Sequence, residues 1–181
     1  AVRAEEFSTF DEVGVFVVDF FVGRNLRSRC QRGHEGRDGC RLFVGVDDLL
    51  LRARDAVVRY ALERAPTALG KPIATLPRIQ RQIGEIDAGL QAARALLFEV
   101  AGLWTGEGDR AAYMARIAAA KCVVTATADE ATEKALQAAG GAAVTRALPL
   151  ERYFRDVRPS AMQPPAGDTA YEMVGRAALG L

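Results

Sequence analysis

The chain has 181 residues, of which half are apolar and about a quarter are charged, an ordinary composition for one folded domain. Its 24 basic and 23 acidic side chains nearly cancel, so the overall charge favours neither nucleic acid nor a membrane surface as a partner. The longest apolar run, residues 13–22, is interrupted by Asp19 and is too short to cross a bilayer. The odd number of cysteines, three, favours reduced thiols and a cytoplasmic location.

Residues 1–46 are expected to differ from the rest of the chain. β-Branched and aromatic side chains crowd residues 10–22 and Gly23 follows them, which predicts a short N-terminal β segment. Residues 24–45 are rich in Arg and Gly and have few apolar side chains, so they are predicted to form a loop. We therefore divide the chain into residues 1–46, a strand with its loop, and residues 47–181, a helical domain.

The second part of the chain carries the periodicity of helices, because apolar side chains recur three or four residues apart. The predicted helices are residues 47–64, 78–104 and 110–139. Asp47 is predicted to cap the first of them, and Gly140 with Gly141 to end the third. Long antiparallel helices joined by short loops predict a mainly α fold, an up-and-down four-helix bundle.

The stretch from Leu150 to Asp168 interrupts this regularity. It begins as a short amphipathic turn and continues as a loop that contains Pro164 and Pro165. Asp168 is then predicted to cap a last helix, Thr169 to Leu179.

Few residues in the N-terminal part form a recognisable chemical site. Cys30, His34 and Cys40 lie close in sequence, but a zinc site normally needs four ligands and no fourth is near, so no metal site is predicted. Six arginines between residues 24 and 41 could bind phosphates, but no aromatic side chains are interleaved with them and a solvated loop is favoured. His34 is the sole histidine, so a Ser-His-Asp or Cys-His arrangement has no support.

The stretch QAAGG, residues 137–141, has two interpretations. Two glycines directly after a long helix can simply end it. They can also let backbone N–H groups approach a phosphate-bearing cofactor closely. The residues alone leave both interpretations open.

Three stretches, in the same order and at similar spacing, resemble the C-terminal half of the acyl-CoA dehydrogenase family. They are RYALERAPTALGKPI (residues 59–73), QAAGG (137–141) and LPLERYFRDVR (148–158). The resemblance covers roughly residues 47–181, and FDEVGVFVVDFFVG (10–23) resembles the strand that leads into that half. It implies the helical bundle of that family's C-terminal domain, with Leu69 standing where the family has Phe.

The resemblance also implies a cofactor and its binding residues. The cofactor is FAD, in a homodimer or homotetramer. Arg64 matches the arginine that meets the pyrophosphate of the flavin nucleotide, and Gln137, Gly140 and Gly141 match residues that touch the FAD of a neighbouring subunit. The expected reaction is oxidation of a CH–CH bond in an acyl-CoA thioester, as in lipid metabolism.

One departure concerns the catalytic base. The family's usual glutamate stands nine residues after the arginine that Arg155 matches, and this chain has Pro164 there, which cannot take a proton. Asp38, Asp47 and Asp48 are acids in the other region where some members place the base, and the sequence does not choose among them. Two alternatives follow, a flavin-dependent monooxygenase of the same superfamily and a non-catalytic helical interaction module.

Overall fold

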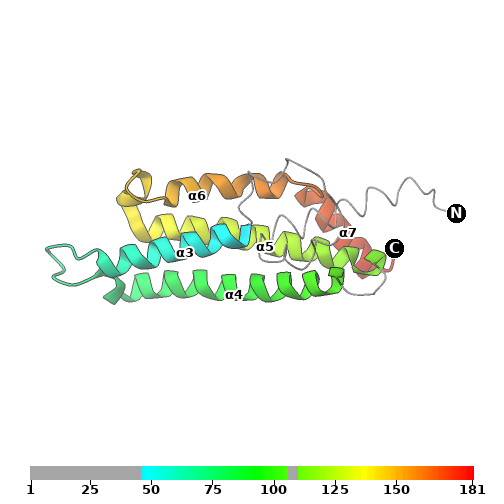
Figure 1. The fold of residues 1–181 in the computed structure, drawn as a ribbon, viewed down its shortest axis with the longest axis horizontal. Helices are drawn as coiled ribbons and strands as arrows, with labels where there is room; N and C mark the ends of the chain where they lie inside the picture. The colour runs from blue at the N-terminus through cyan, green and yellow to red at the C-terminus, as the bar shows by residue number, and fades with distance from the viewer. Residues whose placement is uncertain (1–45, 106–109) are drawn as a thin grey trace.

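The computed structural model describes residues 46–105 and 110–181, and in that part the chain is helical throughout, without a strand (Figure 1). The α-helices are α3 (Val46–Glu63), α4 (Pro77–Thr105), α5 (Arg110–Ala139), α6 (Leu150–Val157) and α7 (Gly167–Leu179). Short 3-10 helices are η2 (Ile73–Thr75), η3 (Gly140–Val144) and η4 (Arg158–Met162). The predicted β segment and the Arg/Gly-rich loop lie outside the described residues.

Four of the helices, α3 to α6, run alternately up and down and form the bundle, with α7 placed across one end (Figure 1). Helix α5 is central, since it packs against α3, α4, α6 and α7. The predicted helical fold is confirmed. The fourth bundle helix is α6, which occupies part of the stretch predicted to be a turn, because its Leu150 and Val157 are buried on one face against the bundle.

The N-caps predicted at Asp47 and Asp168 were wrong, while Asp109, which the sequence also favours as a cap, lies outside the described residues. Helix α3 begins at Val46, so Asp47 lies inside it. Helix α7 begins at Gly167 after the N-cap residue Ala166, which makes no side-chain cap, and Ala170 N–H donates to Ala166 C=O at 2.8 Å. Asp168 is therefore an exposed residue of the first helical turn, where the helix dipole still favours a carboxylate.

The core is an apolar stripe of α4 packed on an alanine-rich face of α5. The stripe residues that are buried are Ile79, Ile86, Leu90, Ala93, Leu97 and Val100, while Ile83 packs at its edge and is half-buried. Small side chains let α4 and α5 approach closely, and a Cβ added at Gly89 would lie 3.2 Å from the Thr127 side chain. The predicted stripe is therefore confirmed.

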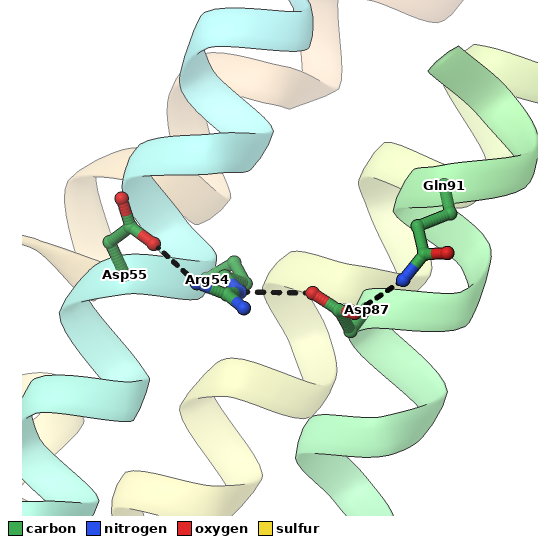
Figure 2. A network of polar contacts seen from close by, with 4 residues as sticks. All are labelled: Arg54, Asp55, Asp87 and Gln91. Atoms are coloured by element: carbon green, nitrogen blue, oxygen red, sulfur yellow. Dashed lines mark hydrogen bonds and ion pairs between the residues drawn. The ribbon is translucent and has the colours of Figure 1, made fainter. Parts of the chain in front are cut away.

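A polar network joins α3 to α4 beside this core, as Figure 2 shows. Arg54 Nε donates to Asp87 at 3.0 Å across the two helices, and Arg54 Nη1 donates to Asp55 at 2.9 Å. Gln91 donates to the second oxygen of Asp87 at 2.7 Å. Partly exposed ion pairs contribute only about 0–1 kcal/mol, so this network fixes the register of α3 on α4 more than it adds stability.

Candidate functional site

The four residues predicted to bind the cofactor belong to segments that meet at one end of the bundle. The C-terminal end of α3, the start of α4, the C-terminal end of α5, η3 and the start of α6 all lie at this end (Figure 1). Arg64 directly follows α3, Gln137 is in the last turn of α5, and Gly140 and Gly141 begin η3. We call residues 63–78 and 137–150 the glycine end.

The two glycines of this end differ in backbone conformation. Gly140 has φ +61°, in the left-handed region that L side chains rarely adopt, so the fold itself requires glycine where α5 ends. Gly141 has no such φ, and a Cβ built on it would meet nothing within 4 Å. Its bare backbone is therefore not needed for packing within the chain, and it is open to a group from outside.

The segments of the glycine end also carry four cations without an ion-pair partner in the described ranges. Arg64, Lys71, Arg78 and Arg146 are exposed, and none has an ion-pair partner among the described residues. Glu63 is the sole acid within residues 63–78 and 140–150. The glycine end thus carries an excess of positive charge that suits an anionic group such as a phosphate.

Arg64 is held by its backbone while its side chain stays available. Its N–H donates to Tyr60 C=O, and its own C=O accepts from Ile73 N–H, both at 2.9 Å. Gln137 is exposed, with one long hydrogen bond of 3.4 Å to Glu133 in the preceding turn. Both side chains can therefore turn to an external ligand without loss of a strong internal contact.

A second polar region surrounds Lys121, which the sequence did not single out. The side chain is 2% exposed, and its Nζ donates to Gln163 C=O at 2.7 Å, to Ala161 C=O at 3.4 Å and also to Pro165 C=O. Burial lowers the pKa of Lys121 below its ordinary value. The lysine thereby ties the segment that contains Pro164 to α5.

Lys121 begins a polar row on α5, since Thr125 and Asp129 follow it at intervals of four residues and share its helix face. The row meets η4, where Arg158 Nη1 lies 3.5 Å from Asp129 Oδ1. Burial raises the pKa of Asp129, and the charge of Arg158 opposes this shift. Ser160 is 1% exposed, and its hydroxyl and that of Thr125 have no hydrogen-bond partner within the described part of the chain. Such a row in an alanine-rich helix is the signal that could have revealed Lys121.

The exposed groups of the same segment are few. Pro164 is exposed and offers no group that can take a proton. Asp168, four residues on, is exposed and has no ion-pair or hydrogen-bond partner in the described ranges.

Residues 46–105 and 110–181 give no support for a metal site or a membrane-spanning helix. They contain no cluster of three or more His, Cys, Asp or Glu residues that could hold a metal ion. No helix there is long and apolar enough to span a membrane. Cys30, His34, Cys40 and the arginines of residues 24–41 lie outside the described residues, as do Asp38 and the predicted loop.

The family model for the acyl-CoA dehydrogenase C-terminal domain matches residues 49–177, which include nearly all of α3 to α7. The chain belongs to the acyl-CoA dehydrogenase family. The resemblance inferred from the three sequence stretches is thereby confirmed, and the helical bundle is this family's C-terminal domain.

Relatives and solved structures agree with this family. The Bacillus subtilis protein YdbM, named among the acyl-CoA dehydrogenases, is 35% identical over 127 residues, which cover 70% of this chain and 32% of YdbM. The bovine mitochondrial short-chain specific acyl-CoA dehydrogenase is 31% identical over 106 residues, or 59% of this chain and 24% of that enzyme. The FAD complex of PigA superposes with a TM-score of 0.67 at 25% identity, over 75% of this chain and 34% of PigA.

The chain therefore spans about a third of the length of the acyl-CoA dehydrogenase YdbM and about a quarter of the bovine enzyme. The matched part is the C-terminal helical domain of the family, and in this chain it contains Arg64, Gly140 and Gly141.

Proposed function

We propose that this chain is the C-terminal helical part of an FAD-dependent acyl-CoA dehydrogenase-like enzyme, an oxidoreductase that acts on CH–CH bonds of acyl-CoA thioesters. The observation that carries the proposal is the glycine end, where the segments that carry the exposed Arg64 and the glycine pair lie at the same end of the bundle. Family membership and the FAD complex of a structural neighbour support it.

The residues of the glycine end fit the cofactor that the family uses. Arg64 would hold the pyrophosphate through its guanidinium, and Lys71, Arg78 and Arg146 add to the attraction for phosphate. Gly141 would admit the cofactor to the backbone, because no side chain blocks the approach. Bound FAD supplies the two-electron acceptor of the reaction. Because this end faces outward, we infer that the cofactor belongs to a neighbouring subunit of a homodimer or homotetramer, in the cytoplasm.

We propose that the carboxylate of Asp168 is the base that takes the α-proton of the substrate. Pro164 cannot do so, and Asp168 is the nearest following carboxylate in the chain. Its competing role as a helix cap is excluded, since Ala166 is the N-cap and forms no side-chain cap. Glu172, one turn further along α7, is also exposed and serves as a matched control.

The test purifies the native polypeptide that contains this sequence, adds FAD and follows the visible flavin absorbance without oxygen. Bleaching by an acyl-CoA supports dehydrogenation. Substrate hydroxylation that needs oxygen and a flavin reductase would instead establish the monooxygenase, and failure to retain FAD would favour the interaction module.

Two variants assign the roles. Arg64→Ala should weaken FAD binding roughly tenfold to a hundredfold, because hydrogen bonds to charged groups contribute about 1.5–3 kcal/mol. Arg52→Ala, on α3 and paired with Asp48 at 2.9 Å, should leave binding unchanged. Asp168→Asn should retain FAD but slow flavin reduction by about 10²–10⁴-fold, the usual contribution of a general base, whereas Glu172→Gln should not. Equal rates for both acid variants would refute the assignment of Asp168.

A further inference from the structure

Lys121 brings a positive charge into the bundle, and one short segment compensates it. Lysine is almost never fully buried unless it is paired. Within the described residues no carboxylate pairs with Lys121, and its acceptors are the backbone oxygens of Ala161, Gln163 and Pro165. An ammonium has three N–H donors, so each of the three carbonyls can accept one.

The segment that accepts these hydrogen bonds is short of backbone N–H donors of its own. Residues 163–166 lie between η4 and α7 and belong to neither helix. Pro164 and Pro165 have no N–H, so neither can donate to a helical ladder. Carbonyls turned to the interior need a donor, and the ammonium of Lys121 replaces those that the prolines lack.

The three accepted carbonyls come from alternate residues, and exposure alternates in the same way. Ala161, Gln163 and Pro165 are half-buried, whereas Met162 and Pro164 between them are exposed, Met162 to 81%. The residues whose carbonyls accept from Lys121 are thus the residues whose side chains are the more buried. The ion pair of Arg158 with Asp129 anchors the preceding end of η4 to the same face of α5.

We propose that Lys121 is a positioning residue that fixes residues 161–166, and with them the first turn of α7, through its hydrogen bonds to three backbone carbonyls. The segment includes Pro164, the position at which the family resemblance expects the base, and leads to Asp168. The consequence for catalysis rests on the proposed function, while the order of the segment does not.

The experiment compares Lys121→Met with Lys121→Arg and Lys134→Met by hydrogen exchange and mass spectrometry on the whole chain. Lys134 is a matched control because it lies on the same helix but pairs with Glu85 and Glu130 through a partly exposed side chain. In Lys121→Met, peptides covering residues 158–172 should exchange at least about tenfold faster, while α3 and α4 stay protected. Lys121→Arg should restore much of the protection, and Lys134→Met should leave this segment unchanged.

Equal loss of protection throughout the bundle, or no loss in residues 158–172, would overturn the proposal. If Lys121→Met does not fold, Lys121→Gln, which keeps two N–H donors, should show the same local effect at smaller size. In flavin assays of the native polypeptide, Lys121→Met should lower kcat at least about tenfold with little change in FAD binding. If the unsubstituted protein reduces no flavin, the proposed function fails, but the exchange result still decides the positioning role.

Discussion

The glycine end and the segment around Pro164 treat their charged groups in opposite ways. Around Lys121 the chain uses its own carbonyls to satisfy a buried cation. At the glycine end, four exposed cations find no ion-pair partner in the part of the chain that the structure describes. A cation engaged by its own fold holds chain segments together, whereas exposed cations without an ion-pair partner stay available to a group from outside the chain.

Both regions rest on the same core between α4 and α5, so a substitution in that core should have the largest effect on stability. Leu97 is 3% exposed in the face of α4 that packs on α5. Leu97→Ala should lower the free energy of unfolding by about 2–5 kcal/mol, measured by urea denaturation, and should deprotect both regions together in hydrogen exchange. Ile83→Ala, at the half-buried edge of the same stripe, should cost less than about 2 kcal/mol. A near-neutral Leu97→Ala would show that this face of α4 is assigned wrongly.

Substitutions of the two glycines should have smaller and unequal effects on the free energy of unfolding. Gly140→Ala should destabilise the chain by about 1–2 kcal/mol, since an L residue must then adopt the left-handed conformation at φ +61°. Gly141→Ala should change the free energy of unfolding by less than about 0.5 kcal/mol, because its Cβ enters open space. Gly141→Ala should nevertheless weaken FAD binding if the backbone there serves the cofactor. Equal destabilisation by the two substitutions would mean that Gly141 serves the fold.

The sequence predicted the long helices well and the polar details poorly. The buried stripe of α4 was visible because period and burial coincide over many turns. The cap predicted at Asp168 lies two residues after the N-cap Ala166, which forms no side-chain cap, and Asp47 lies inside α3. Arg64 and Gly141 could be proposed from their motifs, and their role stays a prediction.

The polar row of α5 could have drawn attention to Lys121, but its partners could not be predicted, because they are backbone carbonyls about forty residues away. Backbone acceptors carry no residue type that a sequence pattern can display. Only the packing of η4 and α7 on α5 brings them to the ammonium.

The smallest expected effects concern pH, and they have opposite signs at Asp129 in the polar row and at Glu85 on α4. Burial raises the pKa of Asp129 above its ordinary 3.8, so between pH 3.8 and the higher folded value the native chain binds more protons than the unfolded chain. Its contribution to stability therefore falls as pH rises through that window. On α4, hydrogen bonds from Lys134 and then Arg81 lower the pKa of Glu85 below 4.5. Its contribution is present above pH 4.5 and is lost as pH falls through the lower folded value.

Urea denaturation from about pH 3 to pH 7 measures both contributions by difference. The stability of Asp129→Asn relative to the unsubstituted chain should rise with pH, because the substitution removes the cost of ionising a partly buried carboxyl. The stability of Glu85→Gln relative to the same reference should fall with pH, and this difference should shrink at about 1 M salt because Glu85 and its partners are partly exposed. Differences of the same sign would mean that the polar row does not desolvate the Asp129 carboxyl.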